Sequence, residues 1–154
     1  MITIKRVSEI QASDFDEIWA IVRYPKKLSH AFGKKLKCIY DLAPTSDLFS
    51  ICQELKKDDD WHKGTFKDIY VPRFLKDLAR NDQARTLLAD LCREDKRGKR
   101  IALICYCSDE RMCHRSIISG LLQGAGIEID NSLHEDYSRY YKQYKAILSD
   151  IERK

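Results

Sequence analysis

One stretch of the sequence decides the fold: Arg100-Ile101-Ala102-Leu103-Ile104-Cys105-Tyr106, followed directly by Cys107-Ser108-Asp109-Glu110-Arg111-Met112-Cys113-His114-Arg115. Residues 100–106 are apolar on both alternating faces, which is typical of a strand buried inside a parallel sheet. A polar loop follows, and apolar residues at helical spacing from 117 to 122 predict a helix that Gly124 ends. Strand, loop and helix in this order predict one unit of an α/β domain.

The rest of the chain supports the same architecture. Apolar runs with the pattern of strands cover residues 2–7, 18–24, 38–42 and 127–129. Apolar residues at helical spacing cover residues 48–55, 65–78, 84–91 and 135 to the C-terminus, with Pro72 predicting a kink or break in the second of these. We therefore expect a single three-layer α/β domain over residues 1–154, with a mainly parallel central sheet and helices on both faces.

Composition excludes several classes of protein. The chain has 154 residues, 44% of them hydrophobic and 34% charged, which fits neither a disordered nor a fibrous protein. No apolar run approaches the roughly 20 residues that span a bilayer, and the first residues resemble no secretory signal. We expect a cytoplasmic protein with no membrane partner.

Cysteine usage singles out one segment. Three of the six cysteines are scattered, and we expect them to be small packing residues. The other three, Cys105, Cys107 and Cys113, fall within nine positions at the end of the buried strand. A domain of this size folds on its hydrophobic core, so the cluster need not be a disulfide framework.

The cluster has the side chains of a nucleophilic site that binds anions. Ligands of parallel α/β sheets bind at the carboxyl ends of strands, where helix N-termini contribute positive charge and free N–H groups. A thiolate beside an imidazole and a guanidinium has a lowered pKa. Cys105 and Cys113 are therefore candidate nucleophiles, His114 the candidate general base, and Arg111 and Arg115 candidate substrate-binding residues.

Other interpretations of this segment remain open. Cys105, Cys107, Cys113 and His114 are the ligand types of a structural Cys₃His zinc site, although Cys105-Tyr106-Cys107 differs from the usual C-x₂-C knuckle. The thiols could also form a redox pair, or could be packing residues whose neighbours brace the turn. We predict no cofactor and no catalytic metal.

The spacing from Cys105 to Arg111 also matches the C-x₅-R loop of cysteine phosphatases. Such loops cradle phosphate with several backbone N–H groups and usually contain glycine. The loop here has no glycine and contains Asp109 and Glu110, whose carboxylates would repel phosphate. The spacing is therefore weak support for phosphatase chemistry.

Residues outside the segment suggest two kinds of partner. Arg23 follows the run 18–24, so in a parallel sheet its guanidinium would emerge near Cys105, where it could bind carboxylate or phosphate or pair with Asp41. The basic residues 93–100 and the tyrosines and cations of residues 137–145 favour a different function, a non-catalytic nucleic-acid-associated module.

Several of these segments together resemble one family. The strand ending in Cys105-Tyr106 and the later Cys113-His114-Arg115 resemble the domain-of-unknown-function 488 family, as do Trp19-Ala20-Ile21-Val22-Arg23-Tyr24-Pro25 and Leu42-Ala43-Pro44-Thr45-Ser46-Asp47-Leu48. The resemblance extends roughly from residue 3 to residue 130 and implies a compact α/β fold.

The resemblance also implies a shared pocket, built from Arg23, Cys105, Cys113, His114 and Arg115, and no particular reaction. We therefore expect an enzyme-like protein whose partner is an anionic small molecule, either phosphorylated or nucleotide-like. The nucleic-acid module and the structural zinc site are the alternatives.

Overall fold

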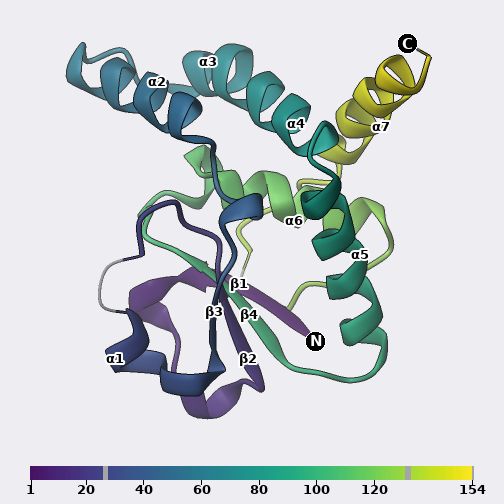
Figure 1. Ribbon diagram of the computed structural model, residues 1–154. Coiled ribbons are helices and arrows are strands. Elements are labelled where there is room, and N and C mark those ends of the chain that lie inside the picture. The colour runs from purple at the N-terminus through teal and green to yellow at the C-terminus, as the bar shows by residue number, and fades with distance from the viewer. Residues whose placement is uncertain (26–27, 131–132, 154) are drawn as a thin grey trace.

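A computed structural model describes residues 1–25, 28–130 and 133–153. Within these residues four parallel strands form one sheet in the order β1-β4-β2-β3 (Figure 1). The strands are β1 (Ile2–Arg6), β2 (Glu17–Ala20), β3 (Leu36–Cys38) and β4 (Ile101–Cys105). Every residue of β4 is buried between its two neighbours, as its continuous apolar sequence predicts.

Some strands differ in length from the prediction. β2 ends at Ala20, where residues 18–24 suggested a longer strand, and β3 precedes most of the predicted run 38–42. The reason is that the chain folds into a 3₁₀ turn at Tyr40–Leu42 after this short edge strand. Of the predicted strand 127–129, only Ile129 bridges to Ile2.

Helices of three to fifteen residues lie on one side of the sheet. They are α2 (Ser46–Lys57), α3 (Lys63–Thr65), α4 (Val71–Ala79), α5 (Asp82–Lys96), α6 (His114–Gly124) and α7 (Arg139–Glu152). Figure 1 shows them together on one side, with α1 (Leu28–Phe32) apart from them beside β3. The predicted α/β domain with a parallel sheet is confirmed, and its two faces are covered unequally.

Side-chain caps fix where two of these helices begin. The Thr45 side chain accepts a hydrogen bond from the Leu48 N–H, 3.2 Å away, at the start of α2. Asn81 caps α5 in the same way through the N–H groups of Gln83 and Ala84. Such caps satisfy N–H groups that a helix cannot pair internally.

The chain around Pro72 stays helical, but its hydrogen-bond pattern changes just before the proline. A wide π-helical turn, Phe66–Tyr70, joins α3 to α4. Proline has no amide hydrogen and its ring crowds the preceding turn, and a wide turn at this point accommodates both effects. The predicted kink or break is thus a local widening of the helix, and Tyr70, at the end of the wide turn, lines the same cavity as Cys105 and Cys107.

None of the helices in the described ranges has both the length and the apolar character that crossing a membrane requires.

Candidate functional site

A cavity of about 560 Å³ lies at the carboxyl ends of β2 and β4. Its walls come from the segment after β2, from α2 and the residues just before it, from the turn around Tyr70, from the end of β4 with the segment that follows, and from the start of α6. The lining residues are Val22, Arg23, Tyr24, Pro44, Phe49, Cys52, Gln53, Lys56, Tyr70, Cys105, Tyr106, Cys107 and His114. The strand ends predicted to hold the site therefore do border a hollow.

Three cysteine sulfur atoms converge at this end of β4. The Sγ atoms of Cys105, Cys107 and Cys113 all lie within 4.8 Å of one another, and those of Cys105 and Cys113 are 3.1 Å apart. The loop between them folds back through a 3₁₀ turn, Glu110–Met112, and returns the start of α6 to the end of β4. Cys105 and Cys113 are buried, whereas Cys107 is partly exposed.

The imidazole of His114 is buried behind the thiols in a defined tautomer. Its Nε2 lies in hydrogen-bond contact with the carbonyl oxygen of Ile21, and because a carbonyl only accepts, Nε2 must carry the proton. Burial lowers the pKa of His114, so the ring is held neutral. Its Nδ1 is then an acceptor, and it faces the Cys113 Sγ at 3.6 Å.

The three thiols differ in acidity because they share hydrogen bonds. A hydrogen bond to Cys107 raises the pKa of Cys105, and burial raises the pKa of Cys113. Hydrogen bonds from Cys105 and then Cys113 lower the pKa of Cys107, and the positive charge of Lys56 acts in the same direction. If one proton leaves the cluster, the negative charge is best held on Cys107.

Of the arginines selected from the sequence, only Arg23 lines the cavity. Its Nε donates to the Pro44 carbonyl at 2.9 Å and its Nη2 to the Tyr40 carbonyl at 3.0 Å, whereas Asp41 accepts a hydrogen bond from Asn81. A guanidinium has five N–H groups, so three remain for a ligand.

The other two arginines lie elsewhere. Arg115 is 3% exposed, and its Nε and Nη1 atoms have no hydrogen-bond partner among the described residues. Arg111 is exposed beside Asp109 and lines a separate hollow with Arg139. The structure thus brings together Cys105, Cys113, His114 and Arg23, and leaves Arg111 outside.

The sequence interpretation missed the helical wall of the cavity. Phe49, Gln53 and Lys56 belong to α2 and line the cavity together. Their spacing of four and then three residues places them on one helix face, a signal present in the sequence. Tyr70 was expected in a helix that Pro72 kinks or breaks, and its position at the cavity was not predicted. Cys107 was considered only as a metal ligand, although it is the most accessible of the clustered thiols.

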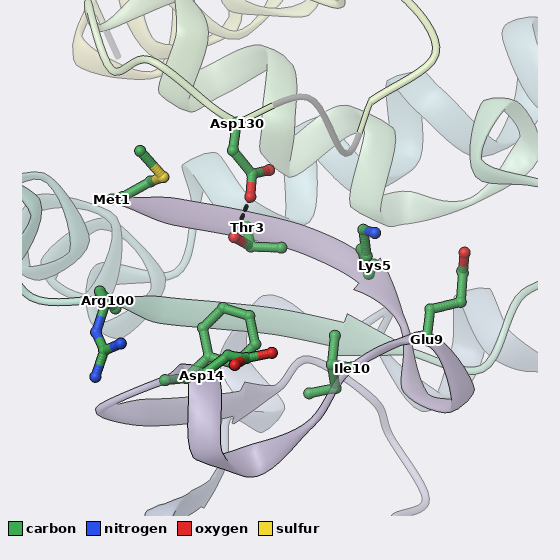
Figure 2. A pocket seen from close by; sticks show the side chains of 9 residues that line it. Met1, Thr3, Lys5, Glu9, Ile10, Asp14, Arg100 and Asp130 are labelled. Carbon is green, nitrogen blue, oxygen red and sulfur yellow. Dashed lines mark hydrogen bonds between the residues drawn. The ribbon is translucent and has the colours of Figure 1, made fainter.

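A second hollow, of about 330 Å³, lies along β1 and contains no thiol (Figure 2). Lys5, Glu9, Asp14 and Arg100 mix both signs of charge around it. At its edge the Thr3 hydroxyl donates a hydrogen bond to a carboxylate. Unlike this hollow, the cavity at the strand ends combines three features: thiols, cations and aromatic rings.

A family model described as the active DUF488-N3 subclade, DUF488-N3a, matches residues 2–126. The matched range includes all four strands and α6, and with them every residue that lines the thiol cavity. No curated protein and no solved structure matches the chain.

Proposed function

The chain belongs to the DUF488 family, in the DUF488-N3a subclade, and on that premise we propose that it is a thiol-dependent enzyme acting on an anionic, nucleotide-like ligand. The carrying observation is that Cys107, partly exposed, stands with two further thiols at a cavity that contains cations and aromatic rings. The description of the matching subclade as active supports a catalytic role.

The cavity walls support the ligand class. Tyr24 and Phe49 meet edge to face with ring centroids 5.0 Å apart, and Tyr24 is largely exposed, so a planar ring can pack against them. Arg23 and Lys56 supply two cations, and the lining contains no carboxylate. An aromatic ring attached to a phosphate or carboxylate matches this combination.

Cys107 is the proposed nucleophile. Its thiolate attacks an electrophilic carbon or phosphorus of the ligand and displaces a leaving group, which departs with the bonding electron pair. Cys105 and Cys113, the nucleophiles suggested by the sequence, are buried and act here by donating S–H hydrogen bonds to Cys107. The His114 ring stays neutral, and its Nδ1, which faces Cys113, is the alternative acceptor for the single S–H of that thiol.

Alkylation of the native protein tests the nucleophile. With iodoacetamide at pH 7 and peptide mass spectrometry, Cys107 should react faster than Cys92, a partly exposed cysteine outside the cluster. Cys107→Ser should remove the fast phase, and Cys52→Ser, which changes a cavity thiol outside the cluster, should leave it intact. Equal rates for Cys107 and Cys92 would contradict the proposal.

Protection by ligands tests the substrate class. Nucleoside monophosphates should slow alkylation of Cys107 in a saturable way, and the unphosphorylated nucleosides should do so less. Arg23→Gln should weaken protection about tenfold or more, the value of a charge-assisted hydrogen bond. If the nucleosides protect as well as their phosphates do, the cavity does not select anions.

The nucleic-acid alternative has less support from the structure than from the sequence. Arg93 and Arg97 pair with acidic neighbours on α5, and Arg100 pairs with Asp16. The tyrosines expected to stack on bases are largely packed into the core: Tyr137, Tyr140 and Tyr144 are buried. The alternative remains a prediction, and nucleic-acid affinity that falls steeply with salt would support it.

A further inference from the structure

We propose that Cys105, Cys107 and Cys113 form a three-thiolate site for a thiophilic divalent cation of the Zn²⁺ type, with a fourth coordination position open to the cavity. The sulfur atoms come from the end of β4, the following loop and the residue that caps α6, and all lie within 4.8 Å of one another. This inference goes beyond the proposed function and holds even if the cavity binds no nucleotide.

The distances suit such an ion. Zinc–thiolate bonds are about 2.3 Å long, so tetrahedral geometry places ligand sulfurs about 3.8 Å apart. The Cys105 and Cys113 sulfurs, at 3.1 Å, need to separate by less than about 1 Å, which side-chain rotation can supply. The cluster is therefore close to the required triangle before an ion arrives.

The donor set is three thiolates and excludes His114. The converging group contains only the three sulfur atoms, and the unprotonated Nδ1 of His114, which faces the Cys113 Sγ at 3.6 Å, lies outside it. The structure thus favours a Cys₃ site over the Cys₃His zinc site suggested by the sequence. Cys105 and Cys107 line the cavity, so the fourth position faces it, an arrangement that catalytic zinc sites share.

Charge and ligand chemistry select the class of ion. A divalent ion with three thiolates carries one net negative charge, and Arg115, two residues after the ligand Cys113, is a buried cation. The Nε and Nη1 groups of this guanidinium have no hydrogen-bond partner among the described residues. The cavity lining has no carboxylate, so Mg²⁺ and Ca²⁺ lack the oxygen ligands they require.

Bound metal would also control the reactivity of the pocket. A thiolate that coordinates a cation is a weaker nucleophile, so Cys107 cannot serve both roles at once. Zn²⁺ should therefore slow alkylation of Cys107, and a chelator should restore the original rate.

Cobalt substitution tests the site directly. The reduced, metal-free full chain is titrated with Co²⁺, and thiolate-to-cobalt charge transfer in the near ultraviolet should saturate at one ion per chain and disappear when Zn²⁺ is added. Cys107→Ser should weaken Zn²⁺ binding by at least about 100-fold, because loss of even supporting residues costs 10- to 100-fold. Cys52→Ser, which lines the same cavity outside the cluster, should bind normally.

Two results would overturn the inference: absence of the charge-transfer band, or equal weakening by Cys52→Ser and Cys107→Ser. Circular dichroism of both variants shows whether they are folded, and Cys107→Ala replaces Cys107→Ser if the latter is not. The alkylation and ligand-protection experiments are done in excess chelator. Because no metal is bound under those conditions, these experiments test the proposed function independently of the metal site.

Discussion

Glu17, at the start of β2, is enclosed by opposite charge. Its carboxylate pairs with Lys37 of β3 and with Lys99 just before β4, and it accepts a hydrogen bond from the Trp19 indole at 3.2 Å. Burial by itself raises the pKa of Glu17, but the hydrogen bonds from Lys37, Lys99 and Trp19 outweigh it and lower the pKa to about 2. This one side chain links three neighbouring strands of the sheet.

We predict that Glu17 makes the fold sensitive to acid. Because its folded pKa lies below the ordinary value of 4.5, its contribution to stability is complete above pH 4.5 and is lost as the pH falls toward 2. Urea unfolding at a series of pH values should show this loss. Glu17→Gln should flatten the profile in that window, and the exposed Glu54→Gln should not. Parallel profiles for wild type and Glu17→Gln would contradict the prediction.

α6 depends on a close approach by the chain leading into α7. α6 is buried from His114 to Leu122, between the sheet and the outer helices. A Cβ added at Gly120 would lie 2.1 Å from the carbonyl oxygen of Tyr137. Backbone cannot move aside as a flexible side chain can, so only glycine fits at this crossing.

We predict that Gly120→Ala destabilises the protein by about 1–3 kcal/mol, the usual cost of overpacking. Alanine favours a helix by about 1 kcal/mol over glycine, so a loss of stability would show that packing outweighs helix propensity. Urea denaturation measures the difference. A variant as stable as the wild type would mean that Tyr137 does not lie against α6 as described.

The core of the protein also includes described residues that follow the range matched by the family model. That match ends at residue 126, yet the aromatic rings of Tyr137, Tyr140 and Tyr144 are buried. The Tyr137 hydroxyl donates to the buried carboxylate of Glu110 at 2.6 Å, in the loop that joins the cysteines. The C-terminal segment thus contributes to the same core.

We predict one cooperative unfolding transition for residues 1–154, as expected of a single domain. A chain truncated after residue 130 should lose that cooperativity, because it exposes the face of α6 that α7 covers. Thermal circular dichroism and binding of a hydrophobic dye measure both. Two transitions in the full chain, or an unchanged melt of the truncated chain, would contradict the single-domain prediction.

The elements of the fold that could be predicted best are those set by a pattern in neighbouring residues of the sequence. The apolar run of β4 and the helical spacing of α6 follow from chain periodicity, so the βα unit and its position were predictable. The convergence of three sulfurs depends on how tightly the loop 106–112 turns, which no periodicity reports. Arg111 was expected in the cavity because it precedes a helix, but the 3₁₀ turn directs it outward.

The hydrogen bonds on Glu110 have a consequence for dynamics. Its carboxylate is held by the Tyr137 hydroxyl and by the backbone N–H of His134, both beyond the range matched by the family. The loop that carries Cys107 is therefore anchored in part by residues outside the range that the family model matches. Exchanging the segment after residue 126 between family members offers a means to change how fast this loop opens without altering a single cysteine.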